Sequence, residues 1–287
     1  MSIMTKFKRS WKLVGASWRV IRDEPSLMVY PVLSLVAMLP FFGLILGGLY
    51  FFLGDTEDPS TGQLIGGIVL MGLSLLVTAF IGTYFSTALC ANALARLRGE
   101  DPTFGDGMRV ASTRLGAIFQ FAVVSAVVGL ILSAIREKGG LVGNLTAGMG
   151  QVAWGFATAL AVPTIADQGL GAKDAITTSF GLLKRSFGEQ IGGSAGISAI
   201  ILVPMLVIGL IVAGLIGLGS MMELQWLIAT GITIGIIGCV VLMILMLTVV
   251  AALEQVFNAA LYHWLQDDQV SPYFSEDLMR DTVTNAA

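Results

Sequence analysis

Six long stretches of the chain contain no charged residue: 25–54, 59–95, 115–135, 139–166, 190–222 and 224–253. Each exceeds the roughly 20 residues that an α-helix needs to cross the hydrocarbon layer of a membrane. No water reaches the backbone amides in that layer, so a spanning segment must be helical. The pattern predicts an all-α fold, a polytopic membrane bundle of six transmembrane helices over about 27–53, 64–95, 115–135, 141–166, 191–218 and 226–253.

The composition excludes a soluble globular protein. Charged residues make up 12% of the 287 residues, hydrophobic residues make up 55%, and the mean hydropathy is +0.84. Soluble domains contain about 25% charged residues. Cys90 and Cys239 both lie in apolar stretches, which favours buried free thiols. Because His263 is the single histidine, motifs that need two are excluded, and we predict no metal and no cofactor.

Lysine and arginine are distributed unevenly among the connections between these runs. Fourteen of the sixteen lie in the N-terminal segment, in the loops after the second and fourth runs, and in the tail; Arg136 and Lys138 fall on the other side. Basic loops stay on the cytoplasmic side during insertion. We expect a multi-pass protein of the plasma (inner) membrane with cytoplasmic N- and C-termini. The first apolar run is too long for a cleavable signal peptide.

Residues 1–24 and about 172–188 are predicted to lie on the cytoplasmic membrane surface as amphipathic interfacial helices. In the first segment Phe7, Trp11, Val14, Trp18 and Ile21 recur at helical spacing, and the basic residues lie elsewhere on the helix. Such helices place aromatic rings in the acyl boundary and cations near anionic headgroups. The residues expected at the lipid interface are Trp11, Trp18, Lys8, Lys12, Arg19, Phe180, Lys184, Arg185 and Phe187.

The two surface segments also match each other in sequence. Residues 10–18 and 179–187 share the pattern Ser-aromatic-x-Leu-aliphatic-x-x-Ser-aromatic, and a weaker copy begins at Ser112. Parallel repeats occur in transporters. We infer three repeats, each a surface helix followed by a two-span hairpin, within a transmembrane domain over 25–265; the alternative is that interfacial helices merely resemble one another. Residues 266–287 are predicted to be a polar tail.

Three stretches carry a family resemblance: KRSWKLVGASWRVIRDEPSLMVYPVLS, RLRGEDPTFGDGMRVASTRLGAI and VPTIADQGLGAKDAITTSFGLLKRSFGE. They resemble a family of prokaryotic six-span membrane proteins of unknown function, over roughly residues 7–265. The last stretch is more distantly similar to the membrane domain of glycerophosphoryl diester phosphodiesterases. The resemblance implies a fold and no activity.

A few polar residues near the ends of the spans are candidates for function. Ionisable groups at membrane depth are costly and often functional. The candidate polar intramembrane residues are Glu254, Asn258, Asp167 and Gln120. For Glu254 the alternative is a position in the headgroup layer, paired with Arg96 or Arg98. For Asp167 the alternative is a turn or helix end, because Gly169 follows.

The loop over 99–108 contains three acidic residues, Glu100, Asp101 and Asp106, and by composition alone suggests a cation site. The calcium-loop spacing is absent, and Asp-Pro-Thr favours a turn with Thr103 as the N-cap of a helix. Phosphate-binding loops and zinc-protease motifs are also absent from the sequence. His263 is interpreted as an interfacial residue near the cytoplasmic end of the last span.

These patterns favour a non-enzymatic membrane scaffold, or a component that binds lipid or a partner protein. The expected partners are anionic lipid headgroups on the cytoplasmic face and a second copy or a membrane partner protein, with no nucleic acid. A transporter or channel is the first alternative, and it would need a cavity lined by Gln120, Thr158 or Glu254. A lipid-modifying enzyme is the second, and it would need Asp167, Glu254 and His263 to converge.

Overall fold

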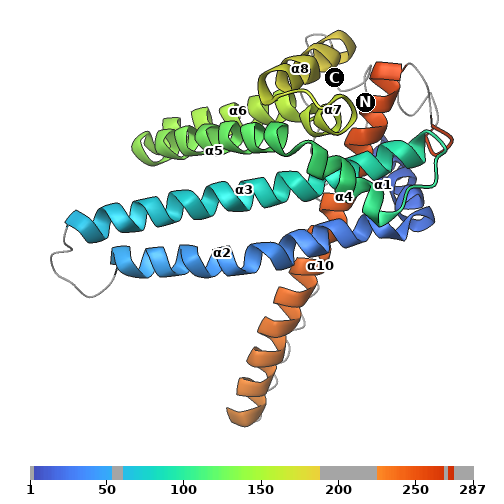
Figure 1. The fold of residues 1–287 in the computed structure, drawn as a ribbon. Coiled ribbons are helices and arrows are strands. Elements are labelled where there is room, and N and C mark those ends of the chain that lie inside the picture. Colours follow the sequence, from blue (N-terminus) through green and yellow to red (C-terminus); the bar gives the residue numbers. More distant parts are fainter. Residues whose placement is uncertain (1–2, 54–60, 188–224, 268–270, 275–287) are drawn as a thin grey trace.

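The computed structural model describes residues 3–53, 61–187, 225–267 and 271–274, and every regular element in those ranges is helical. The order along the chain is visible in Figure 1. The elements are α1 (Ile3–Asp23), the short 3₁₀ helix η1 (Pro25–Met28), α2 (Val29–Leu53), α3 (Thr61–Leu97), α4 (Phe104–Thr113), α5 (Leu115–Lys138), α6 (Gly140–Thr158), α7 (Ala161–Gln168), α8 (Ala172–Phe187) and α10 (Gln225–Asp267).

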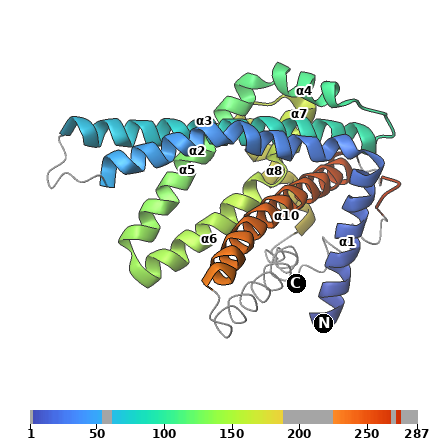
Figure 2. The ribbon, with the colours of Figure 1, turned by 90° about the horizontal axis from the view of Figure 1, so that it is seen from below.

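Five segments in the described part are long and apolar enough to cross a membrane, which confirms an all-α polytopic bundle. They are Pro25–Leu49, Thr61–Leu97, Leu115–Lys138, Val142–Gln168 and Met243–Asp267. The predicted span over 191–218 lies outside the described residues. Two antiparallel hairpins, α2–α3 and α5–α6, extend from a shared end (Figure 1) and splay apart when seen from below (Figure 2). Helix α10 diverges from them and joins the bundle through its C-terminal part.

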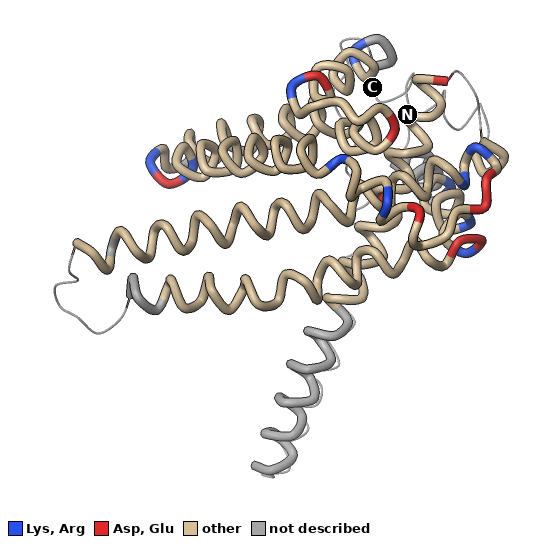
Figure 3. The backbone as a smooth tube through the Cα atoms, in the orientation of Figure 1, with Lys and Arg blue, Asp and Glu red and all other residues tan. Residues whose placement is uncertain are grey.

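Charged residues gather at the shared end of the hairpins, which we call the charged end (Figure 3). The long arms of α2, α3, α5 and α6 carry almost none, and the turn between α5 and α6 adds Arg136, Glu137 and Lys138 at the far tip. The hydrophobic core also lies at the charged end, where it includes Leu94 and Tyr262. Apolar side chains on the arms are largely exposed, as expected for surfaces that lipid covers.

The fourth span is divided, and the break lies near its end rather than in its glycine-rich start. Helix α6 ends at Thr158 and α7 begins at Ala161. Pro163 falls in the first turn of α7, where a residue without an N–H is tolerated. The backbone N–H of Leu160 donates to the hydroxyl of Ser179 in α8 at 3.0 Å. Without this bond, the break in the helix would leave that N–H without an acceptor.

Helix α4 is held tightly against α3 by a glycine and a buried polar group. The side-chain amide of Asn92 donates to the Tyr30 hydroxyl at 2.7 Å and to the Thr103 carbonyl at 2.8 Å. A Cβ added to Gly107 would lie 2.4 Å from that hydroxyl and 2.5 Å from the Ala88 carbonyl oxygen, so only glycine fits. The contact fixes the start of α2, the end of α3 and α4 relative to one another.

Helix α8 ends at Phe187, where this described range stops. Helix α1 precedes the hairpin α2–α3, and helix α4 precedes the hairpin α5–α6. This is the order that the three-repeat interpretation requires, and their common origin stays a prediction. Helix α8 packs on α6 and α7 through Ala172, Ala175, Ser179 and Leu183. Helix α1 packs on α10 and buries Ala16, Val20 and Ile21 (Figure 2).

Candidate functional site

A network centred on Arg98 joins three helices at the charged end. Arg98 directly follows α3, and its guanidinium forms ion pairs with Asp167 of α7 at 2.8 Å and with Asp267 at the end of α10 at 3.0 Å. Nδ1 of His263 lies 2.8 Å from the same Asp267 carboxylate. The hydrogen bond to Asp167, with a further one to Asp267, raises the pKa of Arg98 above its usual value, although burial opposes this.

The inner side of the network is closed by a buried tyrosine. The Tyr262 hydroxyl donates to Asp167 at 3.0 Å and accepts a hydrogen bond from the Gln168 amide at 2.8 Å. Tyr262 is fully buried, whereas the side chains of Arg98 and Asp267 are about one-third exposed. Arg98, Asp167, Gln168, Tyr262, His263 and Asp267 are hereafter the Arg98 network. Its carboxylates already have partners, an arrangement suited to holding helix ends together.

The sequence anticipated only part of this network. Asp167 was a candidate, and the left-handed Gly169 does end α7, as the glycine pattern suggested. The Asp167 side chain, however, pairs with Arg98 and accepts a hydrogen bond from Tyr262. His263 is buried, with only 4% exposed, beside Asp267 at the charged end. Its interpretation as an interfacial residue stays a prediction. The spacing of His263 and Asp267, four residues apart on one helix, was the available signal.

The expected pairing of Glu254 with Arg96 or Arg98 is also wrong. Arg96 pairs with Asp101 at 2.8 Å, and Arg98 pairs within its own network. Glu254 is exposed on α10. Of the other intramembrane candidates, Asn258 is half-buried on α10, and Gln120 is exposed on α5 with its side chain against Gly171.

The acidic loop before α4 uses its carboxylates locally. Asp106 accepts hydrogen bonds from the backbone N–H of Thr103 at 2.9 Å and from its hydroxyl at 2.7 Å. These bonds lower the pKa of Asp106 below its usual value. The N-cap predicted at Thr103 is therefore confirmed. Among the described residues, no group of three potential ligands could hold a metal ion.

The residues predicted at the lipid interface fall on α1 and α8. The side chains of Lys12, Trp18 and Arg19 are exposed on α1, and those of Phe180 and Lys184 are exposed on α8. Arg19 also donates to the Tyr273 carbonyl at 2.9 Å. The backbones of Lys8, Trp11, Arg185 and Phe187 belong to these helices, but their side chains lie outside the described part.

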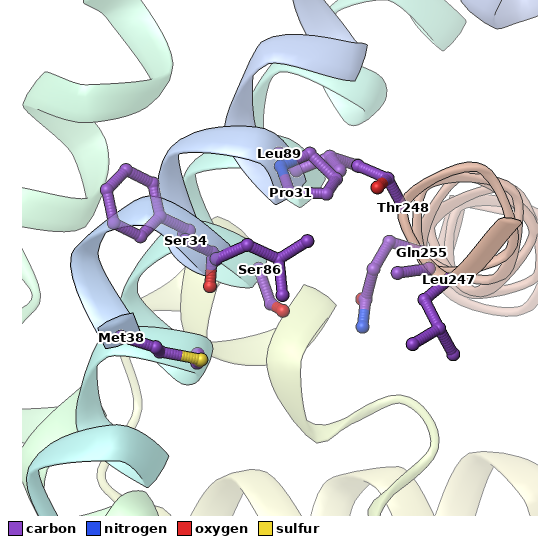
Figure 4. A pocket seen from close by; sticks show the side chains of 12 residues that line it. Pro31, Ser34, Met38, Ser86, Leu89, Leu247, Thr248 and Gln255 are labelled. Atoms are coloured by element: carbon purple, nitrogen blue, oxygen red, sulfur yellow. The ribbon is translucent and has the colours of Figure 1, made fainter. Parts of the chain in front are cut away.

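A cavity of about 310 Å³ lies between α2, α3 and α10. Figure 4 shows Leu247, Thr248 and Gln255 projecting from α10 toward the other two helices. Ser34 and Ser86 supply the remaining polar groups of a lining that contains no charged residue. The lining does not include Gln120, Thr158 or Glu254, the residues on which the transporter alternative depended.

The fold and the charge distribution define an all-α integral membrane protein. Residues 65–271 match the model of a family of unknown function (DUF6159), and the chain belongs to this family. Neither the curated proteins nor the solved structures contain a match. The distant similarity to the phosphodiesterase membrane domain stays a prediction.

Proposed function

We propose that the protein is a non-catalytic component of the plasma membrane that binds anionic phospholipid headgroups on the cytoplasmic face. Helices α1 and α8 would form the lipid-binding surface. The observation that carries the proposal is the separation of charge along the bundle: basic and acidic residues collect at the charged end, and arms almost free of charge extend from it (Figure 3). By the positive-inside rule, that separation supports a cytoplasmic position for both termini.

The composition of α1 supports this role. The helix contains six basic residues against one acidic residue. Trp18 is 47% exposed, although the same helix buries Ala16 and Val20 against the bundle. An exposed tryptophan beside exposed cations is typical of a helix at the acyl boundary of a membrane.

Helix α8 supports the same role from a different part of the chain. Its buried face packs on α6 and α7, while Phe180, 45% exposed, and the exposed Lys184 face away from the core. Phe180 also meets Phe156 of α6 edge-on, with ring centroids 6.4 Å apart. This contact would keep the Phe180 ring near the boundary between membrane and surface.

Limited proteolysis in lipid nanodiscs tests the proposal. Trypsin should cleave after Lys12 about tenfold more slowly in nanodiscs containing phosphatidylglycerol than in phosphatidylcholine alone, because each basic residue gains about 1 kcal/mol near an anionic surface. The double variant Trp11→Glu/Trp18→Glu should lose this protection, while Trp18→Phe should keep it. Arg136→Gln/Lys138→Gln, which alters the opposite tip, is the matched control and should behave as wild type. Equal cleavage rates in both lipids would contradict the proposal.

A further inference from the structure

We infer that the cavity between α2, α3 and α10 binds one acyl chain of a phospholipid from the cytoplasmic leaflet. At about 310 Å³ it falls at the small end of the range of ligand pockets, about 300–1,000 Å³. This inference goes beyond headgroup binding at the surface. Its choice of an anionic phospholipid and of the cytoplasmic leaflet rests on the proposed function, and chain binding in the cavity does not.

The chemistry of the lining favours a hydrocarbon over a polar ligand. The lining has no charged residue, and two of its polar groups already have partners within the protein. The Thr248 hydroxyl donates to the Ile244 carbonyl at 2.5 Å, and the Gln255 amide oxygen accepts from the Cys90 thiol at 3.1 Å. A polar ligand would give up hydrogen bonds to water and find few free groups in the lining to replace them. A hydrocarbon chain makes no hydrogen bonds to water and therefore has none to replace.

The cavity is also placed where a lipid chain can reach it. Leu247 lines the cavity and is 47% exposed, and Ala251, one turn further along α10, lines it and is exposed as well. Both belong to the candidate span Met243–Asp267. An opening on a membrane-facing surface admits a chain sideways from the bilayer without passage through water.

The nearby cations explain why the chain should belong to an anionic lipid. Helix α1 packs on α10 and leads through η1 into α2, so two of the three helices that line the cavity adjoin α1 (Figure 2). Lys12, Arg19 and Arg22 of α1 are exposed. A headgroup phosphate near these side chains would leave its acyl chain beside α2 and α10.

Photocrosslinking of the full-length protein in nanodiscs tests the inference. The probe is phosphatidylglycerol with a diazirine in the middle of one acyl chain, and mass spectrometry maps the labelled peptides. Leu35→Trp places a large side chain in the cavity. Val36→Trp is the matched control, because Val36 is the adjacent residue, is 56% exposed and does not line the cavity.

Labelling of the α10 peptide that contains Leu247 should fall at least fivefold in Leu35→Trp and stay within twofold of wild type in Val36→Trp. A similar decrease in both variants, or in neither, would overturn the inference. A phosphatidylcholine probe with the same chain separates the two proposals. If it labels the cavity as strongly as phosphatidylglycerol and Leu35→Trp still blocks it, chain binding stands and the anionic preference fails.

Discussion

The charged end and the arms of this bundle have similar helices but different packing. At the charged end, Leu94 is 2% exposed and polar side chains bond across helices. On the arm of the same helix α3, Ile68 is 60% exposed. A lipid-covered surface gains little from specific contacts, because lipid tails are as apolar as leucine. The relative positions of the helices are therefore specified mainly at the charged end.

The largest expected difference comes from truncating one large aliphatic side chain in each kind of environment. Leu94→Ala should lower the free energy of unfolding by about 3 kcal/mol, because it opens a cavity in the core. Ile68→Ala, on the arm of the same helix, should cost under about 1 kcal/mol, because lipid refills the space. Equilibrium unfolding in mixed micelles measures both values. Equal losses would mean that the arm is buried in the native assembly.

Glycine substitutions should differ in sign between the two regions. Gly107→Ala should destabilise the protein by about 2 kcal/mol through overpacking against Tyr30 and Ala88. Gly129→Ala on α5 meets no atom within 4 Å and should stabilise its helix by up to about 1 kcal/mol. Thermal unfolding in nanodiscs provides the measurement, and a stable Gly107→Ala variant would refute the close α3–α4 contact.

The smallest expected effect comes from removing an arginine. Arg98→Met leaves Asp167 and Asp267 without their cation and should cost about 1.5 kcal/mol, a value reduced by the partial exposure of the network. Arg136→Met at the far tip should cost under about 0.5 kcal/mol. Hydrogen exchange should also show faster opening of α7 in Arg98→Met alone. Unchanged exchange there would indicate that the network does not hold α7.

The sequence predicted the features that depend on local patterns. Charge-free runs located the spans because the hydrocarbon layer imposes helix on any long apolar segment. Thr103 and Gly169 marked helix ends because capping depends on a few adjacent residues. The two segments predicted as interfacial helices are helical, as α1 and α8, and their position on the membrane surface stays a prediction.

The candidate site was harder to predict because its residues are far apart in sequence. Arg98 lies 69 residues from Asp167 and 169 from Asp267, and no local pattern links them. The same lack of a local pattern explains the wrong partners predicted for Glu254. Arg96 and Arg98 were chosen only because they should lie at a similar depth in the membrane, whereas in the structure they pair with other carboxylates. The cavity depends on how α2, α3 and α10 pack, which hydropathy does not encode.

The hydrogen bond between Leu160 and Ser179 has a consequence for the surface helix α8. A hydroxyl from α8 completes the backbone bonding of a broken transmembrane segment. If α8 moved away, the backbone N–H of Leu160 would lose its hydrogen-bond acceptor, and leaving a buried donor unsatisfied costs about 1–3 kcal/mol. Detachment of α8 is thus penalised from within the bundle, whatever lipid lies outside it.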